Sequence, residues 1–290
     1  MCGLFGAMSL NKGSTISTKL LYKNAEEMDS RGGDCVGWCV AMHNEIMFWK
    51  AECEARQQRK EIRKTSFGRP SVVGHTRFAT HGSTKNDDNN HPHVYSNEYV
   101  VGAVTHNGVI SDHFNIANKN GVDMKGECDS EIIARLIESD SVESSLPTRA
   151  ANAVNECSES DSIALAILET GNNAVDLCLV ARGNPIHYSI RNGVIYYAST
   201  EGELPDSPTK LDEGNILLAR QHVGILDILS GQLDTYQPYS QYSMGRWDYG
   251  GNVQRISSHK KLDTDTPPFQ CQDGFDSFHE YHDFLEKREG

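Results

Sequence analysis

The sequence has no excess of basic residues, no apolar run of membrane length and no Cys-x-x-Cys pair. Each absence excludes a class of protein. The formal net charge is -13 over 290 residues, which argues against a general nucleic-acid binder, because such a protein needs a basic face to displace counterions. The apolar run at 162–168 is far too short to cross a bilayer. The length allows one large domain, or one domain with an appendage.

A secretory signal is also missing, since no basic region followed by an apolar segment opens the chain. We therefore expect a cytoplasmic protein whose eight cysteines are free thiols. Cys35 and Cys39 lack the second pair that a zinc site needs. The histidines at 75, 81, 91 and 93 do not have the spacing of a helical metal motif. We expect no metal and no other cofactor.

The most informative stretch runs from His75 to Gly82 and follows an apolar segment at 71–74 that reads as a buried strand. It places Arg77 at the end of this strand, beside Thr80 and His81. A strand that delivers an arginine to a loop is a plausible place to bind a small anion.

Cys2 follows the initiator methionine directly. Cysteine is small, so we expect removal of Met1 to leave Cys2 with a free α-amine, whose reference pKa is about 7.7–8.0. Such a residue supplies both a nucleophile and its base. Position alone favours a small buried cysteine at the start of a strand, and a lipidated cysteine is a third, weaker option.

Two further stretches carry alternative interpretations. Asn107-Gly108 follows the apolar segment 99–104, and it offers either two oxyanion donors or an ordinary hairpin turn. Asp129 precedes a helical pattern of apolar residues and is placed either to cap that helix or to bind an ammonium group. Taken alone, the turn and the cap are the better interpretations.

Apolar spacing predicts helices at 18–28 and 149–155 and strands at 36–40, 45–49, 162–168, 176–181, 186–190, 194–198, 214–219 and 223–229. Strands therefore cluster at both ends of the chain and helices in the middle, which favours an α+β fold of two antiparallel sheets packed face to face with helices outside. Composition changes after about residue 236, where tyrosine, glutamine and glycine accumulate. The last stretch, 275–285, has the apolar pattern of an amphipathic helix.

Several motifs occur in a fixed order along residues 2 to 235, at 2–6, 31–34, 75–82, 91–93, 106–110, 129–134, 179–185 and 211–214. Together they resemble the class II glutamine amidotransferases, whose glutaminase domain is an N-terminal nucleophile hydrolase. The match is best to the glutaminase domain of glutamine–fructose-6-phosphate aminotransferase. The resemblance implies an αββα four-layer sandwich. It also implies a glutaminase domain at 2–235, followed by an aromatic-rich C-terminal extension at 236–290.

The resemblance implies a thioester mechanism on L-glutamine. It also reverses the simpler interpretations of Cys2 as a buried cysteine, of Asn107-Gly108 as a turn and of Asp129 as a helix cap. Its catalytic residues would be Cys2, Asn107 and Gly108. Its substrate-binding residues would be Arg77, Phe78, Thr80, His81 and Asp129, with Arg31 and Asp34 supporting the Cys2 loop. Arg77 would bind the α-carboxylate in a bidentate way that lysine does not reproduce.

The sequence departs from the family in three places. Phe78 stands where the aminotransferase typically has a tryptophan that gates its ammonia channel, and phenylalanine lacks the indole N–H. Gly33 and Cys35 alter the common Arg-Gly-Tyr-Asp-Ser form. Only about 55 residues follow the glutaminase region, too few for a synthetase domain, so we expect this chain not to carry the sugar-isomerase half of the aminotransferase.

The departures leave three hypotheses. The first is a glutaminase that releases ammonia to a separate acceptor enzyme, which docks through the C-terminal extension unless that extension folds back on its own domain. The second is a hydrolase of another γ-glutamyl or amide substrate, which Arg77 and Asp129 argue against. The third is a glutamine-binding regulator without turnover. We expect neither membrane association nor direct nucleic-acid binding.

Overall fold

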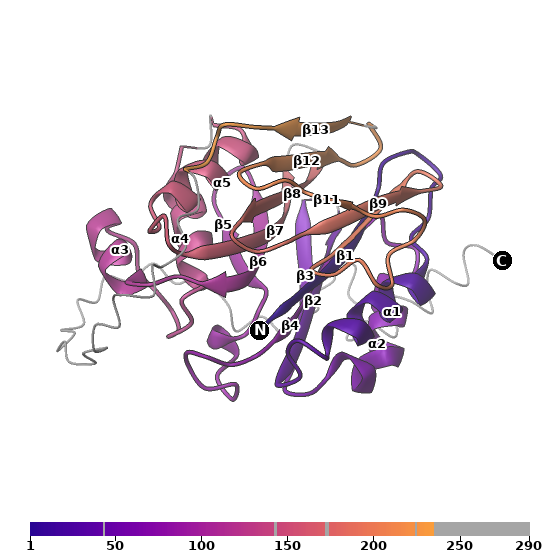
Figure 1. Ribbon diagram of the computed structural model, residues 1–290, viewed down its shortest axis with the longest axis horizontal. Coiled ribbons are helices and arrows are strands. Elements are labelled where there is room, and N and C mark those ends of the chain that lie inside the picture. Colours follow the sequence, from indigo (N-terminus) through magenta and orange to yellow (C-terminus); the bar gives the residue numbers. More distant parts are fainter. Residues whose placement is uncertain (43, 142–143, 172–173, 224, 235–290) are drawn as a thin grey trace. The chain divides into compact units, whose positions relative to one another are not determined.

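The computed structural model describes residues 1–42, 44–141, 144–171, 174–223 and 225–234 (Figure 1). Within these residues the chain forms two antiparallel sheets. The larger sheet, which we call the N-terminal sheet, has the order β11 (Thr209–Lys210), β9 (His187–Arg191), β10 (Val194–Ala198), β1 (Gly3–Ser9), β4 (Ser71–Arg77), β2 (Cys35–Met42) and β3 (Glu45–Ala51).

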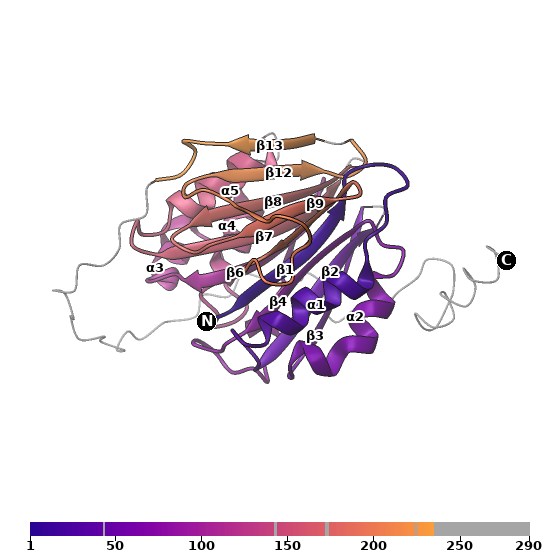
Figure 2. The ribbon, with the colours of Figure 1, turned by 45° about the vertical axis from the view of Figure 1, so that its right-hand side comes forward.

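The second sheet has the order β13 (Ile225–Leu229), β12 (Ile216–Arg220), β8 (Ala174–Arg182), β7 (Ser162–Gly171), β6 (Val101–Val109) and β5 (His93–Ser96). The described helices are α1 (Thr18–Met28), α2 (Arg59–Ser66), α3 (His113–Asn120), α4 (Glu131–Ser139) and α5 (Leu146–Asn155), with short 3₁₀ turns at Ala55–Gln58 and Asp87–Asn89. Figure 2 shows α1 and α2 on the N-terminal sheet, and α4 and α5 beyond the second sheet.

Alternate residues of the central strands enter different apolar clusters, which explains the layers. In β1, Leu4 and Met8 pack between the two sheets, whereas Phe5 and Ala7 pack under α1. Strands β7 and β8 divide in the same way between the cluster that joins the sheets and the cluster beneath α4 and α5. Because a strand turns successive side chains to opposite faces, a strand covered on both faces is continuously apolar. The predicted αββα sandwich is confirmed.

Local sequence signals account for much of this arrangement. The predicted helix 18–28 is confirmed as α1, where the Ser17 hydroxyl accepts the backbone N–H of Leu20 at 3.3 Å and Leu21, Ala25 and Met28 are buried. The paired strands predicted at 36–40 and 45–49 are confirmed as β2 and β3. Helix α3 and the short strands β5 and β11 were not predicted.

No helix among the described residues combines the length and the apolar character needed to span a membrane. The predicted C-terminal helix at 275–285 lies outside the described residues. The domain boundary at residue 235 therefore stays a prediction.

Candidate active site

Cys2 lies at the end of the N-terminal sheet because of the register between β1 and β4. Gly3 is opposite Thr76, so Cys2 continues the strand beside Arg77 and Phe78. The backbone N–H of Phe78 points to the Cys2 sulfur at 3.4 Å, and the thiol lies 3.6 Å from the Phe78 carbonyl oxygen. The strand pair thus holds the Cys2 sulfur against the backbone of Phe78.

Arg31 and Asp34 brace this arrangement from the turn between α1 and β2. The Arg31 Nε donates to the Cys2 carbonyl oxygen at 3.0 Å. The Asp34 carboxylate accepts the backbone N–H of Ala79 at 2.8 Å, and the Asp34 N–H donates to the Arg77 carbonyl at 3.0 Å. Arg31 therefore holds the Cys2 backbone, and Asp34 holds the backbone on both sides of Phe78.

The groups around Cys2 shift the pKa of its thiol in opposite directions. Burial raises the pKa of its thiol, and the Asp129 carboxylate also raises this pKa. The hydrogen bond from Phe78, the α-ammonium at the start of the chain and the Arg77 guanidinium lower it. Because the raising effects prevail, the thiol needs a nearby base before it reacts as a thiolate.

Arg77 is buried at the end of β4, and its guanidinium contacts the loop that follows. Its Nη1 donates to the Asn90 side-chain oxygen at 2.8 Å, and its Nη2 donates to the carbonyl oxygens of His81 and Gly82, the latter at 3.2 Å. All of these acceptors are neutral. The positive charge of Arg77 is therefore not cancelled by a carboxylate among these described contacts.

Asn107 and Gly108 lie within β6 and do not form the hairpin turn that Asn-Gly favours. They continue the ladder with β7, opposite Ala164 and Ile163. The Asn107 side-chain N–H lies 3.5 Å from the Ser199 hydroxyl, which in turn accepts the backbone N–H of Leu4. The side-chain amide of Asn107 is thereby directed from the second sheet toward the start of β1.

Asp129 is buried, but it does not cap α4; the helix begins at Glu131 with Ser130 as its N-cap residue. The capping interpretation was wrong because a tertiary contact takes its place. The Asp129 Oδ2 accepts the backbone N–H of Ile110 at 2.8 Å. The Oδ1 lies 3.9 Å from His81 Nδ1, too far for a close hydrogen bond, so this oxygen faces the 75–82 loop.

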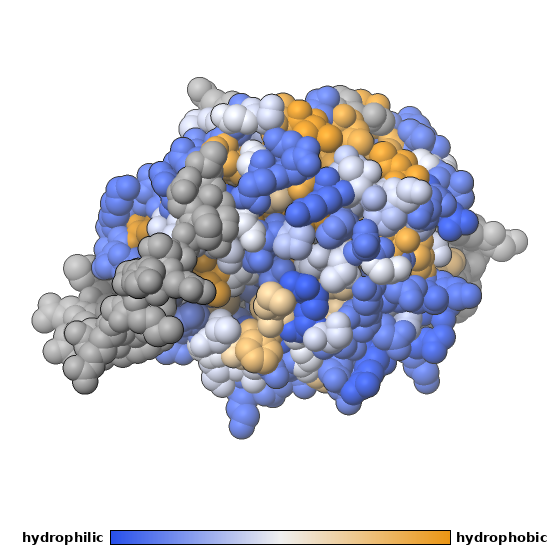
Figure 3. All heavy atoms as spheres, in the orientation of Figure 1, coloured by the Kyte–Doolittle hydropathy of each residue, from blue (hydrophilic) through white to orange (hydrophobic). Residues whose placement is uncertain are grey.

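The remaining predicted residues border this region. His81 is partly buried, and its Nδ1 lies 3.3 Å from the Thr80 hydroxyl. The Thr80 and Phe78 residues are exposed, with 51% of Phe78 accessible. Figure 3 shows a small group of hydrophobic side chains beside the N-terminus, surrounded mainly by hydrophilic residues and separate from the larger hydrophobic area along the upper edge.

One hydrogen bond joins the two sheets below the site. His75 on β4 contacts the His106 carbonyl oxygen on β6 through Nε2 at 2.9 Å. Burial lowers the pKa of His75 to about 3, so its ring is neutral and Nε2 is the donor. This contact fixes the spacing between the strand that carries Arg77 and the strand that carries Asn107.

Sequence reasoning missed several residues that hold these groups in place: Asn90, His106, Ser130, Asn184 and Ser199. Asn184 is an example, since its side chain donates to the Asn107 carbonyl at 3.0 Å from a loop 77 residues away in sequence. His106, Ser130 and Asn184 lie within motifs at 106–110, 129–134 and 179–185, but sequence reasoning gave them no role. Asn90 and Ser199 lie outside the motifs, and nothing in their local spacing separates them from surface residues, because their partners are distant in the chain.

Acid should destabilise the protein through its buried histidines, and His106 provides the test. Burial lowers its pKa, although Asp129 and a hydrogen bond to Ser162 partly oppose this shift. Below the usual histidine pKa of about 6.5 the unfolded chain binds a proton that the native ring does not. The free energy of unfolding should therefore fall with acidification, by up to about 1.4 kcal/mol per pH unit for this residue.

Urea unfolding at several pH values between about 7.5 and 5 measures this slope. We expect His106→Gln to retain less stability at neutral pH, because the Ser130 contact changes, but to show a shallower slope than the wild type. Equal slopes in both proteins would show that His106 does not contribute to the acid sensitivity.

Several known proteins are similar to this chain in sequence or in structure. No family model matches the chain. The glutamine–fructose-6-phosphate aminotransferase [isomerizing] of Staphylococcus aureus is 33% identical over 140 residues, covering 48% of this chain and 22% of that protein. The enzyme of the same name from Bradyrhizobium diazoefficiens is 29% identical over 231 residues, covering 74% of this chain and 34% of that protein. The matched regions thus cover only 22% and 34% of the length of these two curated relatives.

Two solved structures share the fold. The glutamine phosphoribosylpyrophosphate amidotransferase from Bacillus subtilis, complexed with ADP and GMP, superposes with a TM-score of 0.62 at 17% identity, covering 79% of this chain and 49% of that chain. A structure described as the allosteric regulatory enzyme of purine biosynthesis gives a TM-score of 0.62 at 16% identity, covering 76% and 48%.

The two stacked sheets with helices on both outer faces define the fold of the N-terminal nucleophile hydrolases. Within this class the chain has the fold of the class II glutamine amidotransferases, and the resemblance predicted from its motifs is confirmed.

Proposed function

We propose that this chain hydrolyses L-glutamine to glutamate and ammonia, and that it supplies the ammonia to an acceptor reaction on a separate chain. One observation carries the proposal: the Cys2 sulfur lies 3.4 Å from the backbone nitrogen of Phe78, directly after Arg77, and Asp129 faces His81 in the same stretch from the other side at 3.9 Å. A free amino acid carries an α-carboxylate and an α-ammonium, so a pair of opposite charges beside a nucleophile matches glutamine.

The proposed nucleophile is Cys2 after removal of Met1. Its α-amine takes the thiol proton, and the thiolate attacks the carboxamide carbon of glutamine. The resulting tetrahedral intermediate breaks its C–N bond as the α-ammonium returns the proton to the leaving nitrogen. Ammonia departs and a γ-glutamyl thioester remains. Water, deprotonated by the same amine, then attacks the thioester and releases glutamate and the free thiol.

The negative oxygen of this intermediate needs hydrogen-bond donors that are already in place. The Asn107 side chain and the Gly108 N–H are the proposed donors. Support comes from their position in a β-ladder, where the Ser199 and Asn184 contacts limit the movement of Asn107. Rigid donors stabilise developing charge without reorganisation during the reaction.

Glutamine recognition is assigned to the 75–82 loop and to Asp129. Arg77 would bind the α-carboxylate, exchanging contacts with neutral carbonyl oxygens for contacts with an anion. Asp129 would bind the α-ammonium through its Oδ1, since its Oδ2 already accepts the Ile110 N–H. Thr80, His81 and Phe78 would border the bound amino acid.

The ammonia acceptor is proposed to be another protein. The curated relatives are aminotransferases several times longer than the region that they share with this chain. Phe78 is exposed next to Cys2, and an exposed apolar residue beside a site suits a protein contact. A partner covering it would shield released ammonia from water.

The test is glutamate release from glutamine by the full chain, after mass spectrometry has established that Cys2 is the first residue. Asparagine, which is one methylene shorter, should be a poor substrate because its carboxamide would not reach the thiol when its α-groups are bound. Lack of turnover by a chain with Cys2 exposed would contradict the proposal and favour a glutamine-binding regulator. Turnover of simple amides at the same rate would favour a broader hydrolase.

We expect Asp129→Asn to lower kcat/KM for glutamine by about 100-fold, because the amide lacks the charge that pairs with the ammonium. The substituted side chain can still accept the Ile110 N–H. The sharper measurement compares glutamine with glutaramic acid, which has no α-amine. Wild type should strongly prefer glutamine, and the variant should lose most of this preference.

Asp123→Asn is the matched control, because Asp123 is an exposed carboxylate in the same loop. It should leave both substrates unaffected. If Asp129→Asn slows glutamine and glutaramic acid equally, Asp129 supports the fold of the site and does not bind the α-ammonium.

A further inference from the structure

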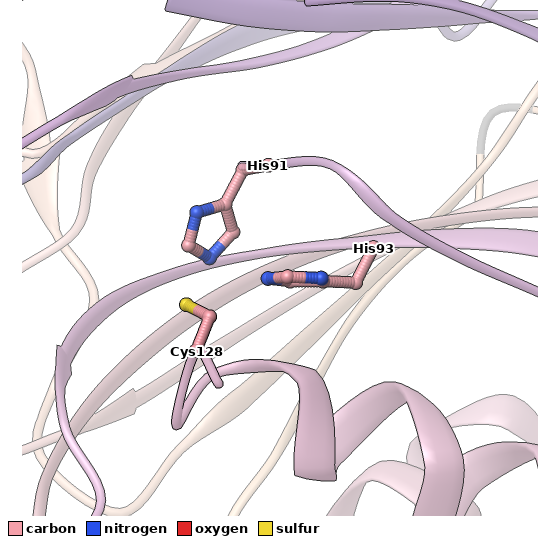
Figure 4. A group of neighbouring side chains, drawn as sticks. All are labelled: His91, His93 and Cys128. Atoms are coloured by element: carbon pink, nitrogen blue, oxygen red, sulfur yellow. The ribbon is translucent and has the colours of Figure 1, made fainter. Parts of the chain in front are cut away.

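A second cluster of reactive side chains lies next to the glutamine site and plays no part in the proposed hydrolysis. His91, His93 and Cys128 are all buried, and one donor atom from each lies within 4.8 Å of the others. Figure 4 shows the two imidazole rings and the sulfur directed toward a common point. Among the described residues this is the one group of three His, Cys or acidic side chains with such spacing.

The ring nitrogens of this cluster are unsatisfied. Both nitrogens of His91 and the Nε2 of His93 are buried without a hydrogen-bond partner. An imidazole has one donor and one acceptor, and leaving either unpaired in a protein interior is costly. Unpaired buried nitrogens that converge with a thiol point to a ligand that is itself a Lewis acid.

The two segments that carry the cluster are held together by other contacts. Asn89 accepts the backbone N–H of Glu127 at 2.7 Å, which ties the segment before His91 to the segment before Cys128. The Glu131 carboxylate accepts the N–H groups of Lys125 and Gly126 at 2.9 and 2.8 Å. The three donors therefore lie on segments that protein contacts hold together, which reduces the ordering needed to bind a metal.

We propose that His91, His93 and Cys128 bind one thiophilic transition-metal ion, with Zn²⁺ as the expected species. Imidazole nitrogen and thiolate sulfur are both zinc donors, with bonds of about 2.0–2.1 Å to nitrogen and about 2.3 Å to sulfur. These bonds place donors about 3.5 Å apart, so the observed cluster needs only a small contraction. On binding, the Cys128 thiol gives its proton to solvent and a thiolate–metal bond forms.

Because of the position of this cluster, a bound metal would affect the structure of the proposed glutamine site. His91 follows Asn90, which binds Arg77, and Cys128 precedes Asp129. An ion between these segments would fix the two charged residues that face Cys2. The metal would take no part in the chemistry at the thiol.

The experiment uses the full chain, treated with a chelator and then titrated with Co²⁺, whose bond to a thiolate gives a near-ultraviolet charge-transfer band. We expect about one equivalent to produce this band, and Zn²⁺ to abolish it by displacement. Cys128→Ser should lose the band, and His93→Gln should weaken Co²⁺ binding by at least about tenfold.

Cys157→Ser is the matched control, because Cys157 is also buried and its thiol donates to the Ala153 carbonyl oxygen, away from the His91–His93–Cys128 group. It should keep the full band. A band of undiminished size in Cys128→Ser would overturn the proposal, since the thiolate would then belong to another cysteine. Folded wild-type protein that gives no band with excess Co²⁺ would overturn it as well. His91→Gln provides a second variant if Cys128→Ser does not fold, with circular dichroism as the check on folding.

Discussion

Cys2→Ala should abolish glutamate release, lowering kcat by about four orders of magnitude or more, because the reaction then lacks the atom that forms the thioester. The change removes one sulfur from a half-buried position and leaves Arg77 and Asp129 in place. Glutamine should therefore still bind. Steady-state turnover together with calorimetric binding of glutamine separates the two effects.

Cys53→Ala is the control, since Cys53 is also partly buried and is unconnected to the 75–82 loop. It should keep wild-type turnover. Unchanged turnover in Cys2→Ala would rule out the proposed nucleophile. Loss of turnover together with loss of glutamine binding would instead show that Cys2 positions the substrate loop.

Gly108→Ala should have the largest effect on folding, about 4 kcal/mol or more in the free energy of unfolding. An added Cβ would lie 1.8 Å from the Ser162 carbonyl oxygen and 2.6 Å from the His106 ring. The carbonyl is a backbone atom of the β6–β7 pair and is not free to rotate away. Strand β6 would have to separate from β7, so the Asn107 amide and the His75 contact would shift with it.

Urea unfolding of Gly108→Ala and of Gly121→Ala tests this explanation. Gly121 ends α3 with a φ of 65°, and an added Cβ there meets nothing within 4 Å. That substitution should cost only about 1 kcal/mol, from the backbone conformation alone. Similar losses in both variants would show that the contact with Ser162 is not the cause.

Much of the fold could be predicted because its strands and first helix have strong local patterns. The helix 18–28 has buried residues at helical spacing and a serine cap. The central strands are apolar on both faces, as expected for strands covered by a second sheet and by helices. Strand β6 was predicted to end in a turn at Asn107-Gly108, yet it continues through both residues to Val109. Its last residues are polar, and only pairing with β7 makes them part of a strand.

The candidate site, like the fold, was predicted only in part. The order of the motifs predicted which segments matter, and the structure brings Cys2, Arg77 and Asp129 to one region of the fold. The motifs did not predict that the Asp129 carboxylate accepts the Ile110 N–H in place of capping α4. They also did not predict that Arg77 donates to the Asn90 side chain. The absence of a local metal motif led us to expect no metal, and this expectation considered His91 and His93 without Cys128.

By itself the sequence determined the class of fold, the alternation of buried faces and the residue types at the site, because these depend on periodicity and on short motifs. Tertiary structure alone decided which distant residues meet. Cys128 is 35 residues beyond His93, and Ser199 is 92 residues beyond Asn107. Such pairs depend on how the sheets stack and on the register of β6 with β7, and no local pattern carries that information.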